Sequence, residues 1–88
     1  MRAASSRGND PARFEKLLDA LDEKLQFGLL DQLIRCNSYH FEGDTLHIQA
    51  ENTQDYENLN RNGTRQQLTF LAQDATGISG VKIEQPQS

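Results

Sequence analysis

The chain has 88 residues, of which 35% are hydrophobic, and its 13 acidic and nine basic residues give a net charge of −4. A chain of this length forms one small domain, which needs nearly every large apolar side chain for its core. No apolar run approaches the roughly 18 residues of a membrane span, and a single cysteine, Cys36, excludes an internal disulfide and is typical of a reducing compartment. We therefore expect a cytoplasmic protein without membrane contact. Its acidic charge and scattered bases disfavour direct binding of nucleic acid.

Two helices are predicted after residues 1–9, a small, polar segment that we expect to be a disordered tail or the end of a linker. Asp10 can cap a helix and Pro11 suits its first position, so a helix is expected to begin here. Its apolar stripe consists of Phe14, Leu17, Leu18, Leu21 and Leu25. Gly28 predicts a break before a second helix at roughly residues 28–35. That helix offers three apolar side chains to the core, Leu30, Leu33 and Ile34.

The next segment predicts a β-hairpin, because its apolar residues alternate with polar ones. These apolar residues are Tyr39, Phe41, Leu46 and Ile48. Gly43 and Asp44 suit a two-residue turn, since both residue types tolerate positive φ. This turn pairs the apolar residues across the strands on one face. It also places His40 opposite His47 on the other face.

Two helices and a strand are expected after the hairpin. Thr53 is a plausible cap for a short helix that Tyr56 and Leu59 anchor and that Asn62-Gly63 ends. A capping box, Thr64 to Gln67, predicts the start of the last helix, which Gly77 closes. The apolar side of that helix consists of Leu68, Leu71, Ala72 and Ala75. A final strand is built on Val81 and Ile83, and residues 85–88 form a tail.

The predicted element order is therefore ααββααβ within a single domain of residues 10–84. Helices combined with a three-stranded sheet in this order predict an α+β fold, a two-layer sandwich with one helix-covered sheet face. The other sheet face is expected to be polar, with His40, Glu42, Thr45, His47, Lys82 and Glu84.

The two histidines raise the question of a metal site. Glu42 shares their face, and Cys36 would need a favourable bend of the chain to reach them. A Zn²⁺ site needs three or four ligands, and neither a CxxC nor an HxxxH spacing occurs in the chain. We therefore predict no metal site, and interpret the histidines as part of a solvated sheet face.

No catalytic residue and no cofactor are predicted either. A reactive thiol needs an electropositive, partly exposed environment, and Arg35 is the only base close to Cys36 in sequence. Gly77-Ile78-Ser79-Gly80 matches the GxxG pattern with which KH domains clamp nucleic acid. The pattern here leads from a helix into a strand and has no basic residue. We interpret Gly77 as a helix cap and Gly80 as a turn residue.

Four segments in order carry a resemblance to a known family: FEKLLDALDEK, LLDQLIRC, FEGDTLHIQAENTQDYENL and RQQLTFLAQDATGISGVKIE. Together they resemble the C-terminal domain of the tau subunit of bacterial DNA polymerase III, the clamp-loader chain, over roughly residues 12–84. The N-terminal domain of the bacterial replication initiator protein, which has a KH-like fold, shows a similar order. It usually has a tryptophan near the start of its first helix, and this chain has no tryptophan.

The resemblance implies a KH-like, non-catalytic domain that tethers a clamp loader to other replisome proteins, such as the polymerase catalytic subunit or the replicative helicase. The alternative is a module that binds single-stranded nucleic acid, or one of the replication-initiator type. As the partner-binding surface we predict the short helix and the loop after it, with Tyr56, Glu57, Leu59, Asn60 and Arg61. Tyr56 and Leu59 also fit an ordinary role in the core.

Overall fold

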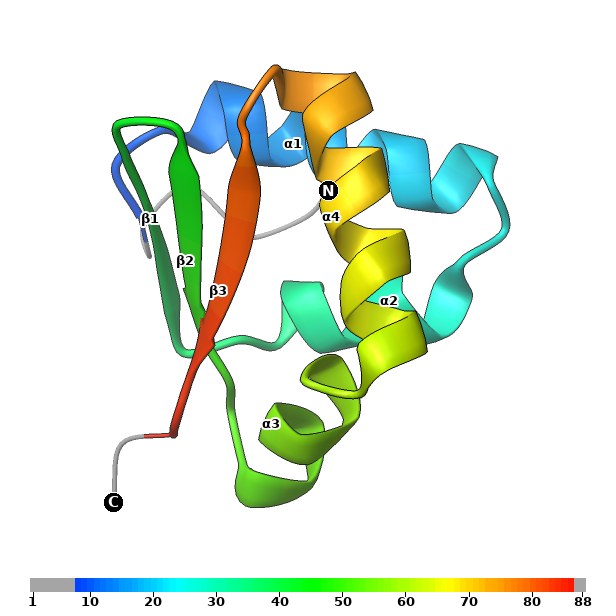
Figure 1. The fold of residues 1–88 in the computed structure, drawn as a ribbon, viewed down its shortest axis with the longest axis vertical. Coiled ribbons are helices and arrows are strands. Elements are labelled where there is room, and N and C mark those ends of the chain that lie inside the picture. The colour runs from blue at the N-terminus through cyan, green and yellow to red at the C-terminus, as the bar shows by residue number, and fades with distance from the viewer. Residues whose placement is uncertain (1–7, 87–88) are drawn as a thin grey trace.

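The computed structural model describes residues 8–86. Its elements are α1 (Pro11–Glu23), α2 (Phe27–Ile34), β1 (Ser38–Glu42), β2 (Thr45–Gln49), α3 (Thr53–Leu59), α4 (Asn62–Thr76) and β3 (Gly80–Glu84). The three strands lie in the order β1-β2-β3, with β1 antiparallel and β3 parallel to β2. Figure 1 shows the sheet on one side of the molecule and the helices on the other. The predicted element order and the two-layer α+β fold are therefore confirmed.

The hairpin has the predicted register. Phe41 lies opposite Leu46, and His40 lies opposite His47. Gly43 has φ of 59°, a left-handed conformation that glycine adopts without steric cost. Because side chains alternate across a strand, this register directs the apolar residues of β1 and β2 toward the helices.

The core lies between the sheet and the helices. Phe14 of α1 is fully buried, and its ring stacks on that of Tyr39 with centroids 3.8 Å apart and planes 5° apart. Phe41 meets Tyr39 edge to face at 6.0 Å, and the Arg13 guanidinium lies 4.8 Å from the centre of the Phe41 ring. The remaining large side chains with less than 2% exposure are Leu17, Leu18, Leu21, Leu33, Leu46, Ile48, Leu59, Leu68 and Cys36.

The break between the first two helices is at Leu25, so the prediction of a break at Gly28 was wrong. Leu25 has φ of 60°. Its N–H donates to the Asp22 carbonyl (3.1 Å), and the Gln26 N–H donates to the Leu21 carbonyl (2.8 Å). These two bonds form a Schellman motif, whose left-handed residue is usually glycine. Gly28 instead lies in the first turn of α2.

Two predicted helix starts also need correction. The cap of α3 is Asn52, whose side chain accepts a hydrogen bond from the Asp55 N–H at 2.8 Å, and Thr53 is the first helical residue. The last helix begins at Asn62, so Thr64 lies inside it and the expected capping box does not form. Its predicted end is confirmed, because Gly77 is the C-cap with φ of 75°.

The folded part begins earlier than the predicted boundary at residue 10. The Asn9 side-chain amide donates to the Phe41 carbonyl (2.9 Å), and its oxygen accepts from the Phe41 N–H (2.8 Å). Asn9 thus pairs with the outer edge of β1, as a neighbouring strand would. Gly8 lies so close to the Tyr39 ring that an added Cβ would clash with it. The other predicted tail residues, 1–7 and 87–88, lie outside the described residues.

A partly buried ion pair joins α2 to α3. Arg35, just after α2, donates two hydrogen bonds to the Asp55 carboxylate, at 2.7 and 2.8 Å. The Asp55 side chain is only 5% exposed, whereas that of Arg35 is 42% exposed. These hydrogen bonds raise the pKa of the Arg35 guanidinium. The two hydrogen bonds fix the end of α2 against the start of α3.

Candidate functional site

Three large apolar side chains are exposed among residues 8–86. They are Leu25 at 71%, Phe70 at 64% and Phe27 at 52% exposure. Leu25 and Phe27 flank the turn between α1 and α2, and Phe70 lies on α4. Sequence analysis assigned Leu25 to the buried stripe of the first helix, which is wrong, and did not assign the two phenylalanines. Phe70 is outside the helical spacing of Leu68, Leu71 and Ala72, which is the signal that could have found it.

Leu25 combines this exposure with a strained backbone. It is the one non-glycine residue with positive φ in the described part of the chain. A left-handed conformation costs a residue with a side chain on the order of 1 kcal/mol relative to glycine. With its side chain 71% exposed, Leu25 recovers little of this cost by burial. The fold therefore presents a large apolar side chain at a position where glycine would be more stable.

We expect Leu25→Gly to stabilise the isolated domain by about 0.5–1 kcal/mol, because it removes the left-handed strain. The larger entropy of glycine in the unfolded chain makes the gain smaller than the full strain energy. Urea unfolding of the two proteins measures this difference as an upward shift of the midpoint. The control is Phe27→Gly, which places glycine at the first position of α2, where there is no left-handed strain to remove, and is not expected to raise the midpoint. A lower midpoint for Leu25→Gly would contradict our interpretation of this turn.

A shallow groove of about 350 Å³ lies beside this turn. Leu25 and Phe27 form its apolar side, and Gln32 of α2, Asn58 of α3 and Thr64 of α4 contribute polar groups. Two segments that are distant in sequence, residues 25–32 and residues 58–64, thus meet around the two exposed apolar residues. We define these five residues as the turn groove.

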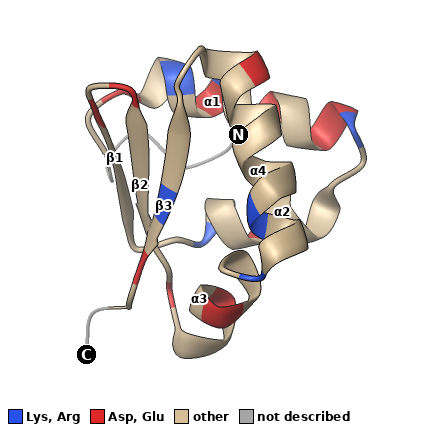
Figure 2. Cartoon of the chain, viewed as in Figure 1, with Lys and Arg blue, Asp and Glu red and all other residues tan. Residues whose placement is uncertain are grey.

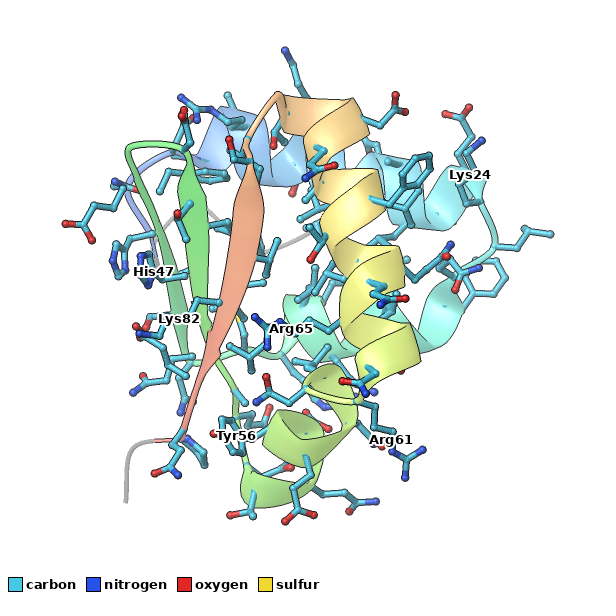
Figure 3. The ribbon with its side chains drawn as sticks, viewed as in Figure 1. Lys24, His47, Tyr56, Arg61, Arg65 and Lys82 are labelled. Atoms are coloured by element: carbon cyan, nitrogen blue, oxygen red, sulfur yellow. The ribbon has the colours of Figure 1, made fainter. Side chains whose placement is uncertain are left out.

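The predicted partner-binding residues divide into exposed and buried ones. Leu59 is fully buried in the core, so it offers no surface to a partner. Tyr56 is partly buried against the core, and Asn60 is half-buried at the end of α3. Glu57 and Arg61 are exposed, and Figure 3 shows Arg61 pointing away from the body of the molecule at the α3–α4 corner. The prediction for this region therefore depends on Tyr56, Glu57, Asn60 and Arg61.

A second open groove, of about 570 Å³, lies next to this region. Tyr56 and Glu57 line it together with Glu51, Thr53 and Pro86, among others. Its lining combines polar and apolar groups in similar measure and includes two carboxylates. It shares no residue with the turn groove.

The basic residues do not gather on one face. Figure 2 shows lysine and arginine on α1, on α4 and its preceding loop, and on β3, with acidic residues between them. Arg61 and Arg65 are close in sequence at the start of α4, and both are exposed. The GxxG segment does not present a free loop, because Ile78 is 4% exposed and the Ser79 and Gly80 N–H groups approach the Asp44 carbonyl at 2.7 and 3.3 Å.

The open sheet face carries the predicted polar residues. Figure 3 shows His47 and Lys82 on the side of the sheet that faces away from the helices. His40 and His47 stack with ring centroids 4.4 Å apart and planes 2° apart, and Glu42 lies near both rings. Cys36 does not reach this face, because it is buried in the core at 1% exposure.

None of the helices in the described range 8–86 is long and apolar enough to cross a membrane. Comparisons with known proteins give no relative from which to transfer a function. Neither a protein-family model, nor a curated protein, nor a solved structure matches the chain.

Proposed function

We propose that this domain is a non-catalytic protein-interaction domain of a cytoplasmic DNA polymerase III clamp-loader subunit, which tethers the clamp loader to another replisome protein. The observation that carries the proposal is Leu25. Its large apolar side chain is exposed on a backbone conformation that favours glycine. Strained residues of this kind concentrate at binding sites. A partner that covers Leu25 and Phe27 would offset the cost of the strained turn.

The turn groove supplies what a small protein interface needs. A few well-packed anchor residues carry most of the binding energy of such interfaces, at an apolar centre that a polar, hydrogen-bonding rim surrounds. Leu25 and Phe27 are the apolar part, and Gln32, Asn58 and Thr64 supply the polar part. The resemblance to the tau C-terminal domain names the candidates for the partner, the polymerase catalytic subunit and the replicative helicase. Binding of single-stranded nucleic acid is less well supported, because the basic residues are dispersed over the fold and acidic residues lie between them.

Isothermal titration of the 88-residue chain with each of the two purified replisome proteins tests this proposal. We expect saturable binding to one of them. Each of the variants Leu25→Ser and Phe27→Ser is expected to weaken it by at least tenfold, because each removes an apolar contact of about 1.4 kcal/mol or more. Phe70→Ser is the control, since Phe70 is equally apolar and exposed but does not line the turn groove.

Two outcomes would contradict the proposal. One is the absence of binding to both proteins at tens of micromolar, accompanied by strongly salt-dependent binding to single-stranded DNA, which would favour the alternative function. The other is that Leu25→Ser and Phe27→Ser both bind as tightly as the unchanged chain. In that case Tyr56→Ser and Arg61→Ser are measured, and weaker binding by these variants would locate the interface at the surface predicted from the sequence.

A further inference from the structure

The histidine cluster on the open sheet face has the composition of a metal site. The His40 and His47 Nε2 atoms lie 3.8 and 3.5 Å from one oxygen, Oε1 of Glu42. One ligand atom from each of the three residues can be chosen so that all lie within 4.8 Å of one another. Among residues 8–86, this is the group of three or more His, Cys, Asp or Glu residues whose ligand atoms lie this close together. Two imidazoles and a carboxylate are a known set of protein ligands for Zn²⁺.

The separations are close to those that a bound ion requires. Zn²⁺ binds nitrogen and oxygen at about 2.0–2.2 Å, so two ligand atoms at a tetrahedral ion are about 3.3 Å apart. The two distances to Glu42 exceed this value by only a few tenths of an ångström. The two rings are parallel and stacked, so both side chains must rotate about their side-chain bonds before the Nε2 atoms face a common ion. The backbone register that holds the rings opposite each other need not change.

Glu84 contacts the second ring nitrogen of His47. Its carboxylate Oε2 lies 3.2 Å from Nδ1 of His47, on the side of the ring away from Glu42. When Nδ1 donates its proton to a carboxylate, the Nε2 atom is left as the acceptor that can bind a metal. Carboxylate–histidine pairs of this kind orient the ligands in many zinc sites and increase their basicity. A solvated sheet face does not require a carboxylate next to Nδ1 of His47. The contact between Glu84 and His47 was not predicted from the sequence.

The surroundings are compatible with a divalent cation. The carboxylates of Glu42 and Glu84 contribute two negative charges, and Lys82, beside His47 in the sheet register, contributes one positive charge. The Lys82 side chain is exposed and long, so its ammonium group can extend into solvent. The side chains of the three ligands are 46%, 75% and 16% exposed for His40, Glu42 and His47. An ion can therefore enter directly from solvent.

We propose that His40, His47 and Glu42 form a Zn²⁺ site with one coordination position left for water or another ligand, and that Glu84 orients His47 within it. This proposal differs from the sequence-based prediction of no metal site, which rested on the number of available ligands and on the lack of a CxxC or HxxxH spacing. It lies on the sheet face away from the helices, whereas the turn groove lies on the helical side. This inference is therefore independent of the proposed partner-binding function.

Zinc titration of the untagged 88-residue chain, followed by NMR of the histidine ring signals, tests the site. We expect both rings to shift and to reach saturation at one equivalent of Zn²⁺. His40→Ala, His47→Ala and Glu42→Ala are each expected to weaken binding by at least tenfold, and Glu84→Ala by about tenfold through the orientation of His47. Thr45→Ala, on the same face, and Cys36→Ser are controls that should bind as the unchanged chain does.

Several results would overturn this inference. Unshifted ring signals at equimolar Zn²⁺ would exclude the site. A shift of one ring alone, or loss of binding in Cys36→Ser, would place the ion elsewhere. We expect the variants to fold, because none of the substituted cluster residues belongs to the hydrophobic core. Circular dichroism of each variant verifies this. If Glu84→Ala binds Zn²⁺ as tightly as the unchanged chain, Glu84 does not orient His47, and that part of the proposal is wrong.

Discussion

Phe14→Ala is expected to lower the free energy of unfolding by about 4 kcal/mol. Phe14 is fully buried, and its ring stacks on Tyr39 at 3.8 Å, so the substitution removes both apolar burial and the ring contact between α1 and β1. A domain of this length has a total stability of about 4–13 kcal/mol. We therefore expect most of the stability to be lost, and a large fall in the urea midpoint.

Phe70→Ala is the matched control for this prediction. Phe70 is 64% exposed on α4, and an exposed site of this kind usually changes stability by less than about 0.5 kcal/mol. Similar losses for Phe14→Ala and Phe70→Ala would contradict the position of the core between α1 and the sheet. Phe14→Leu retains much of the apolar volume and is expected to have an intermediate effect.

Arg35→Ala is expected to cost about 2 kcal/mol, because it leaves the Asp55 carboxylate buried without its bidentate partner. Loss of one partner from a fully buried ion pair costs roughly 3–5 kcal/mol. The 42% exposure of the Arg35 side chain reduces the expected value here. Urea unfolding of the two proteins under the same conditions measures the difference.

Substitution of the other partner, Asp55→Ala, should cost less, about 1 kcal/mol, because the Arg35 guanidinium can then rotate toward solvent and be hydrated. Arg61→Ala, at an exposed arginine, is the control and should have little effect. Equal effects of Arg35→Ala and Asp55→Ala would show that burial of Asp55 does not determine the energy of the pair.

The hairpin and the layers were predictable from the sequence for a physical reason. A strand has a side-chain period of two, so the alternation around Gly43-Asp44 permits one register that buries Phe41 and Leu46 together. A shift by one residue would place these side chains in water. The positions of His40 and His47 opposite each other follow from the same register.

Gly77 marked the end of α4 correctly, but other helix ends were not predictable in the same way. A glycine within a helix costs only about 1 kcal/mol, and Gly28 is accommodated in the first turn of α2. The chain instead turns at Leu25 by hydrogen bonds between backbone groups, which side-chain patterns do not reveal. At the start of α4 the capping box at Thr64 does not form, since the helix begins two residues earlier, at Asn62.

The ion pair and the candidate sites could be identified only from the tertiary structure. Arg35 and Asp55 are 20 residues apart, and no periodicity links two polar residues over that distance. Glu84 reaches His47 only because β3 lies parallel to β2, a pairing on which the strand pattern gives no information. The exposure of Leu25 became apparent only with the backbone turn that removes it from the apolar stripe of α1.

We propose that Leu25 serves partner binding at the expense of stability. Measurement of Leu25→Gly, in both urea unfolding and titration with the replisome protein that binds the unchanged chain, tests it most directly. We predict a higher unfolding midpoint together with binding weakened by at least tenfold. A variant that is more stable and binds as tightly as the unchanged chain would contradict the claim.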